Sequence, residues 1–137
     1  MNGTTTVFYV DDNTRSRRVL SSVLSDCGFE MITAGDPVEA LRRCKKICFD
    51  LALLDYQMPW LTGSQLAHEI KLLTPDVPIV LLSGYAVLPA TELLFVDAHF
   101  GYGTHLDDLL ETMRRLTHSN PPKRAIRTSA AAWLDST

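Results

Sequence analysis

The sequence predicts an α/β domain in which a doubly wound, five-stranded parallel sheet carries helices on both faces. Short runs of aliphatic, aromatic and β-branched residues alternate along the chain with segments whose apolar residues recur at helical spacing. Strands that alternate with helices pair in parallel through right-handed crossovers. At 137 residues, of which 46% are hydrophobic and 21% charged, the chain has the size and composition of one globular domain.

The first two strands and the helix between them have clear boundaries. The run Thr6 to Val10 predicts a buried strand that ends at two aspartates. From Thr14 onward the apolar residues follow helical spacing, and Gly28 supplies the left-handed residue that commonly ends a helix. Phe29 to Ala34 then predicts the second strand.

The second helix is marked by its start signals. Asp36, Pro37 and Glu39 supply an N-cap, a first-turn proline and a carboxylate that reaches back to the cap. The residues expected on the buried face of this helix are Leu41, Cys44 and Cys48. The segment from Asp50 to Asp55 is nearly continuous in apolar residues, which is typical of a strand covered on both faces.

The next two elements follow the same order. A loop from Tyr56 to Thr62 leads into a helix that runs through Ile70 and Leu73. The segment from Val77 to Ser83 predicts a fourth buried strand, in which a proline near the start is tolerated.

The last third of the domain is less regular. Pro89 to Leu94 predicts only a weak helix, because the residue before a proline is pushed toward extended geometry. A short strand is expected around 98–100. The final helix is amphipathic, with apolar residues at Leu106, Leu109, Leu110, Met113 and Leu116. We expect a domain over residues 1–117 and, over 118–137, a proline-containing linker or tail without an effector domain.

Composition limits the function classes. The formal net charge of −3 argues against direct nucleic-acid binding, which draws on a basic surface. Three cysteines without a signal peptide predict a protein of the reducing cytoplasm, and neither their spacing nor neighbouring histidines match a zinc site. The longest apolar stretches are far too short to cross a membrane, so no membrane association is expected.

Acidic residues gather where the predicted strands end. In parallel α/β sheets, ligands bind beyond the carboxyl ends of the strands. Those ends carry Asp11 and Asp12 after the first strand, Asp55 after the third and Ser83 after the fourth. Carboxylate oxygens suit a hard divalent cation such as Mg²⁺, and without a cation their mutual repulsion raises at least one pKa.

This cluster suits phosphoryl chemistry. A carboxylate such as Asp55 can attack phosphorus when a metal ion neutralises charge on the incoming oxygens, which forms a mixed anhydride. Ser83 can donate its hydroxyl to a phosphoryl oxygen, and the amide of Gly84 can approach closely because no side chain intervenes. Each signal has a plain structural alternative, a strand-end turn or a solvated aspartate pair, so their combination carries the prediction.

Three motifs, in this order, resemble the receiver domains of response regulators. They are Val10-Asp11-Asp12-Asn13, Leu54-Asp55-Tyr56-Gln57-Met58-Pro59 with Gly63 four residues after the proline, and Leu82-Ser83-Gly84-Tyr85. The resemblance runs from about Thr6 to Thr117. It implies the flavodoxin-like strand order 2-1-3-4-5 for the five-stranded sheet.

The resemblance also implies roles for the site residues. Asp12, Asp55 and the backbone carbonyl of Gln57 would bind Mg²⁺ directly, and Asp11 would act through water. Asp55 would be the phosphoacceptor and Ser83 the switch hydroxyl, while Gln57 and Tyr85 would tune the access of water. The expected protein is not an enzyme beyond self-catalysed phosphoryl acceptance. Its expected partners are a sensor histidine kinase or phosphotransfer protein and an unknown output protein, and a homodimer with a second copy is left open.

Two positions depart from the family pattern. Receiver domains place a lysine just after the fifth strand, where this chain has Tyr102. Without that lysine, three carboxylates and one Mg²⁺ leave about one net negative charge in the pocket. The lost attraction is not trivial, because an opposite charge at ~4 Å contributes ~4 kcal/mol at a dielectric of 20. His99 stands where the family often has the aromatic residue that reports phosphorylation, and it is either a proton-sensitive switch or a half-buried polar residue. We therefore expect altered switching.

Three other functions compete with this interpretation. A flavin carrier of the same fold needs a phosphate-binding loop where this chain has two aspartates. A phosphohydrolase of the haloacid-dehalogenase type needs a second aspartate at the position of Gln57. The third alternative is a pseudo-receiver, which uses the same fold for dimerisation or partner docking without phosphorylation.

Overall fold

We describe residues 3–118 of a computed structural model. Its five strands form one parallel sheet in the order β2-β1-β3-β4-β5, which confirms the predicted topology. Their bounds are β1 Thr6–Val10, β2 Glu30–Ala34, β3 Leu51–Asp55, β4 Ile79–Ser83 and β5 Ala98–Gly101. The strand order reverses between β1 and β3, so the carboxyl ends of these two strands define the expected ligand site.

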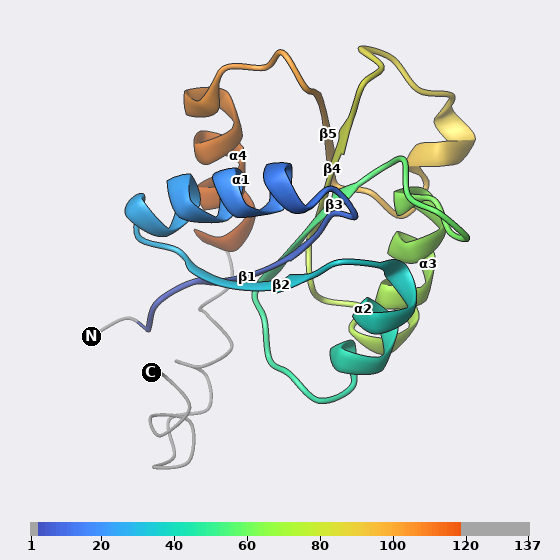
Figure 1. Ribbon diagram of the computed structural model, residues 1–137, viewed down its shortest axis with the longest axis horizontal. Helices are drawn as coiled ribbons and strands as arrows, with labels where there is room; N and C mark the ends of the chain where they lie inside the picture. The colour runs from blue at the N-terminus through green and yellow to red at the C-terminus, as the bar shows by residue number, and fades with distance from the viewer. Residues whose placement is uncertain (1–2, 119–137) are drawn as a thin grey trace.

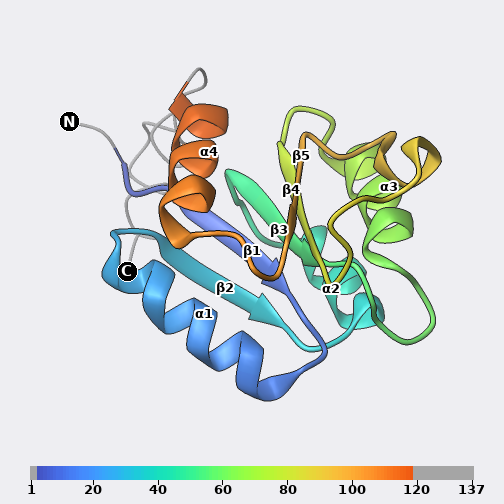
Figure 2. The same ribbon diagram turned by 90° about the horizontal axis from the view of Figure 1, so that it is seen from above.

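Helices cover both faces of this sheet (Figure 1). Their bounds are α1 Thr14–Asp26, α2 Pro37–Cys44, α3 Gly63–Leu73 and α4 Leu106–His118, with a short 3₁₀ helix η1 at Ala90–Leu93. Helices α1 and α4 lie on one face, and α2 and α3 lie on the other (Figures 1 and 2). No helix within residues 3–118 is long and apolar enough to cross a membrane.

The two faces bury two separate apolar clusters because side chains alternate along each strand. Phe8 and Val10 of β1 pack with α2 and α3 on one face. Val7 and Tyr9 of the same strand pack with α1 and α4 on the other. Every residue of β1 and β3 is buried, as expected for central strands of a doubly wound sheet.

The predicted helix signals form the expected contacts. The Asp36 carboxylate accepts a hydrogen bond from the Glu39 backbone N–H at 2.7 Å, and the Glu39 carboxylate accepts one from the Gly35 backbone N–H at 2.9 Å. Gly28 follows α1 with a φ of 100°, a left-handed conformation that glycine adopts without steric cost.

Two local predictions need correction. Helix α2 ends at Cys44, so Cys48 lies in the loop before β3 and not on the buried face of the helix. The weak helix predicted over Pro89 to Leu94 is only the four-residue 3₁₀ helix η1. The expectation for the tail, residues 118–137, falls outside the described residues apart from His118, which ends α4.

Candidate acidic site at the carboxyl edge of the sheet

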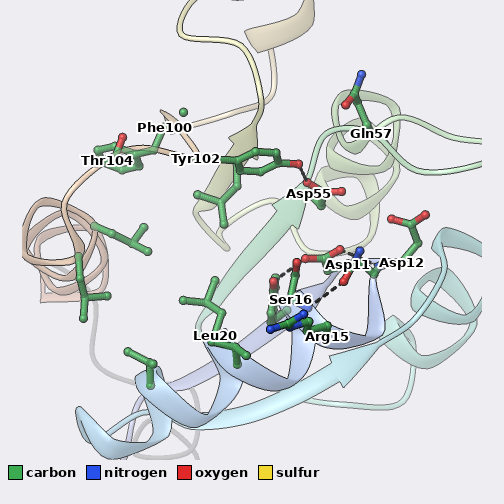
Figure 3. A pocket seen from close by; sticks show the side chains of 18 residues that line it. Asp11, Asp12, Arg15, Ser16, Leu20, Asp55, Gln57, Phe100, Tyr102 and Thr104 are labelled. Carbon is green, nitrogen blue, oxygen red and sulfur yellow. Dashed lines mark hydrogen bonds between the residues drawn. The ribbon is translucent and has the colours of Figure 1, made fainter.

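Three carboxylates meet where β1 and β3 end. Asp11 and Asp12 follow β1, Asp55 ends β3, and each offers a carboxylate oxygen within 4.8 Å of the others. Asp11 and Asp55 are buried, whereas Asp12 is exposed. Figure 3 shows their side chains at the same end of a pocket. The structure thus confirms that the fold brings these three predicted residues together.

Asp11 is fixed by a set of donors. Its carboxylate accepts hydrogen bonds from the Tyr9 hydroxyl at 2.6 Å and from the Asn13 backbone N–H at 2.9 Å. The Arg17 guanidinium donates to the Asp11 backbone carbonyl at 2.6 Å. Burial, followed by the bond to Asp11, raises the pKa of Tyr9, so its hydroxyl remains a donor at neutral pH. Asp11 is therefore held in one orientation.

Asp55 is the most perturbed carboxylate of the cluster. It is only 5% exposed, and burial raises its pKa from 3.8 to about 6. The charges of Asp11 and Asp12 act in the same direction, while hydrogen bonds from Tyr102 and the Tyr56 backbone act in the opposite one. A divalent cation between the carboxylates would favour the ionised form of Asp55.

The glycine of the third-strand motif has a steric role. Gly63 donates its backbone N–H to the Tyr56 carbonyl at 2.8 Å, which places the start of α3 directly against the end of β3. A Cβ atom at Gly63 would lie 2.4 Å from the Asp55 backbone oxygen and 2.7 Å from a methyl carbon of Leu81. Only glycine allows this close approach, which fixes the backbone of the candidate phosphoacceptor.

Tyr102, which follows β5, contacts the Asp55 side chain. Its hydroxyl donates a hydrogen bond to Asp55 Oδ1 (Figure 3). Its backbone N–H donates to the Ser83 carbonyl at 2.8 Å, and its ring lies 3.4 Å from where a Cβ atom of Gly84 would be. Burial and the contact with Asp55 raise the pKa of Tyr102, so the phenol stays neutral. The residue at the expected lysine position thus contacts the acceptor as a donor without charge.

Ser83 forms a different set of contacts from the one predicted for a phosphoryl donor. Its side chain is fully buried, and its hydroxyl bonds with the Tyr85 carbonyl at 2.8 Å and the Tyr85 backbone N–H at 3.1 Å. The same oxygen lies 2.7 Å from His99 Nε2. His99 is therefore joined directly to the predicted switch hydroxyl, and Ser83 must reorient before it can donate to a group on Asp55.

Gln57 lies at the rim of the pocket. Its side-chain amide donates to the Tyr85 hydroxyl at 3.3 Å, which links the two positions expected to tune the access of water. Tyr85 is half exposed. The metal-ligand role of the Gln57 carbonyl remains a prediction.

A groove of about 730 Å³ extends from the carboxylates between α1 and α4. One end is lined by the acidic residues, Gln57 and Tyr102, and the other by apolar side chains that include Val19, Leu20, Phe100 and Leu106. Arg15, in the first turn of α1, also lines this groove. The three carboxylates therefore lie at one end of this groove, and Asp12 is the exposed one.

The residues present fit a Mg²⁺ ion. The donor set is three carboxylates, and oxygen is the ligand type that Mg²⁺ prefers. Within residues 3–118 this is the only group of three or more His, Cys, Asp or Glu side chains with suitable spacing. A dication also offsets the repulsion between two buried carboxylates.

Some contacts of the site were not anticipated from the sequence. Tyr9 and Asp11 are two residues apart at the end of a strand, so their side chains fall on the same side of the sheet. The two-residue alternation along the strand could therefore have revealed their hydrogen bond. The signal for Arg15 and Arg17 was weaker. Both lie in the first turn of α1, which has no acidic residue, although positive charge is unfavourable at a helix N-terminus.

Comparison with known proteins agrees with the fold and the site. The model of the response regulator receiver domain matches residues 7–101. The chain therefore belongs to the response regulator receiver family, and the resemblance expected from its motifs is confirmed.

Two similar proteins, one of them in two solved structures, illustrate this relationship. The cyclic di-GMP phosphodiesterase response regulator RpfG of Xanthomonas campestris is 36% identical over 81 residues, which are 56% of this chain and 21% of RpfG. The Thermotoga maritima response regulator TrrA, solved in complex with Mg²⁺-BeF, is 29% identical with a TM-score of 0.77, over 82% of this chain and 98% of TrrA. TrrA in the complex with the histidine kinase ThkA gives a TM-score of 0.75 at 29% identity, over 82% and 97% of the two chains. This chain spans only about a fifth of the length of RpfG.

Proposed function

We propose that this domain accepts a phosphoryl group on Asp55 from a histidine kinase or phosphotransfer protein of a cytoplasmic phosphorelay, in a Mg²⁺-dependent reaction. The observation that carries the proposal is the burial of Asp55 at the end of β3, with Asp11 and Asp12 carboxylate oxygens within 4.8 Å. The solved relative TrrA, which was captured both with Mg²⁺-BeF and with its kinase partner, supports it.

The chemistry is a substitution at phosphorus. One carboxylate oxygen of Asp55 forms a new O–P bond while the P–N bond of the donor phosphohistidine breaks, and the electron pair of that bond stays on the imidazole nitrogen. The product on this chain is a mixed anhydride. With a small donor such as acetyl phosphate, the P–O bond breaks and acetate leaves.

The residues of the chain prepare this step. Asp11, Asp12, Asp55 and the Gln57 carbonyl would hold the Mg²⁺, which would supply positive charge to the carboxylates and the incoming oxygens. The hydroxyl of Tyr102 must release Asp55 Oδ1 if that oxygen is the one that attacks.

Ser83 and Gly84 are the proposed phosphoryl contacts. Ser83 would exchange its bond with His99, 2.7 Å away, for one with a phosphoryl oxygen. His99 lies on β5 and thereby becomes the proposed switch residue, because loss of this bond frees its imidazole. An output partner or a second copy of the chain would respond to that change.

The test is to incubate the purified protein with Mg²⁺ and acetyl phosphate and to record its intact mass over time. We expect an increase of one phosphoryl group that is absent in D55N and absent when the metal is chelated. A mass increase that persists in D55N would place the modification elsewhere.

A pseudo-receiver is the second candidate, and a specific contact favours it. The neutral Tyr102 hydroxyl occupies an oxygen of Asp55 where a cation would promote phosphoryl binding. In that case Mg²⁺ would bind to the carboxylates, and no mass increase would follow with any phosphodonor.

A further inference from the structure

We propose that Arg15, at the start of α1, supplies the positive charge that binds the phosphoryl group on Asp55, in place of a cation at the position of Tyr102. This inference rests on the proposed phosphoacceptor function. It assigns a phosphoryl-binding role to a residue of α1, on the wall of the groove opposite Tyr102.

The charge of the site requires a further cation. The three carboxylates sum to about −3 and one Mg²⁺ contributes +2, so the site retains about one negative charge before an anionic phosphoryl group arrives. Tyr102 contributes no charge because a phenol is neutral near pH 7. An arginine suits this task, since its planar guanidinium binds phosphate oxygens with paired donors.

Arg15 is the only lysine or arginine within residues 3–118 that lines the groove containing the three carboxylates. Arg17 is bound to the backbone carbonyl of Asp11, and it does not line the groove. Other cations are engaged away from the site: Arg43 with the Thr33 carbonyl, Arg114 with the Cys27 carbonyl and Lys71 with Asp97. Arg15 is exposed, and no hydrogen bond or ion pair of its side chain is found in the described part of the chain.

The position of Arg15 on α1 places it on the wall of the groove that contains the carboxylates. Ser16, Val19, Leu20 and Val23 line the same groove at helical spacing, so Arg15 stands at the end of this stripe nearest the carboxylates. Figure 3 shows Arg15 on the wall below Asp11, with Tyr102 on the wall above Asp55. A phosphoryl group on Asp55 would therefore face the groove that Arg15 lines.

The helix itself does not explain a basic first turn. Positive charge near a helix N-terminus opposes the helix dipole, and α1 has no acidic residue in its first turn. Asn13 already caps the helix by accepting from the Ser16 backbone N–H at 2.9 Å. A phosphoryl group on Asp55 is an anion in the groove that would make this arrangement favourable.

The test compares R15A with R18A, which removes an exposed arginine of the same helix that does not line the groove. We expect R15A to slow phosphorylation of Asp55 by acetyl phosphate about 10- to 100-fold, as for loss of a charge-assisted contact, and R18A to leave the rate unchanged. R15K should recover part of the rate.

A binding measurement separates charge supply from assembly of the site. Mg²⁺ titration by calorimetry, without phosphodonor, should give an affinity for R15A equal to or tighter than that of the unmodified chain, because a nearby positive charge has been removed. Weaker Mg²⁺ binding by R15A would mean that Arg15 only organises the carboxylates, and would overturn the proposal.

Relocating the charge gives a second test. In a Y102K background the added lysine should make Arg15 dispensable, so that R15A costs less than about threefold, while in a Y102F background the full loss should remain. If R15A is phosphorylated as fast as the unmodified chain, this inference alone is overturned. A chain that is never phosphorylated on Asp55, even as Y102K, overturns the proposed function and this inference with it.

Discussion

Replacement of Tyr102 by phenylalanine isolates the hydroxyl that covers Asp55. The ring contact with Gly84 remains, and only the hydrogen bond to Asp55 Oδ1 is lost. Hydrogen bonds to charged groups contribute about 1.5–3 kcal/mol. Tyr102 is 59% exposed, so water weakens its bond to Asp55, and we expect a contribution of about 1–2 kcal/mol.

If this bond must break before phosphoryl transfer, Y102F lowers the barrier by the same amount. We expect acetyl phosphate to label Y102F about 5- to 30-fold faster than the unmodified chain, measured as the initial rate of mass increase at saturating Mg²⁺. Y85F serves as a control, because it removes a tyrosine hydroxyl at the same rim that bonds to Gln57 and not to Asp55. A slower rate in Y102F would refute this reasoning and would make the phenol a phosphoryl ligand.

Three further predictions concern stability. G63A forces a Cβ atom to within 2.4 Å of the Asp55 backbone oxygen and should lower the unfolding free energy, measured in urea, by about 1–3 kcal/mol. The control is G103A, whose added Cβ atom would have no other atom within 4 Å and should change this free energy by less than about 0.5 kcal/mol. Because burial raises the folded-state pKa of Asp55 from 3.8 to about 6, the metal-free protein should lose about 2 kcal/mol of stability as pH rises from about 4 to 6. Urea titrations in chelator should show this loss in the unmodified chain and not in D55N, and a loss of equal size in D55N would assign it to other groups. Y9F removes the 2.6 Å hydrogen bond to Asp11 and should lower the unfolding free energy by about 1–2 kcal/mol; an unchanged value would mean that water replaces the hydroxyl.

The sequence was sufficient for the topology and for the acidic cluster. The continuous apolar strand ending in Asp55 and the strand ending before Asp11 are local signals, and parallel pairing brings their carboxyl ends to one edge. Gly63 was part of the motif that identified the family, and the structure adds the steric reason for it.

Side-chain contacts between residues far apart in the sequence were not predicted. Tyr102 reaches Asp55 across 47 residues, and this bond depends on the path of the chain after β5, for which no local pattern exists. The link between Ser83 and His99 depends in the same way on side-chain orientation across β4 and β5. The helical spacing of Cys44 and Cys48 did not reveal that α2 ends at Cys44, with Lys45 as its C-cap.

Chemical trapping at Asp55 tests the central claim most directly. Borohydride reduces an aspartyl phosphate to homoserine, which peptide mass spectrometry assigns to a single position. After treatment with Mg²⁺ and acetyl phosphate, we predict homoserine at position 55 and a strong decrease when the metal is chelated. Recovery of unmodified Asp55 under conditions in which a control receiver is fully trapped would contradict the account and identify the chain as a pseudo-receiver.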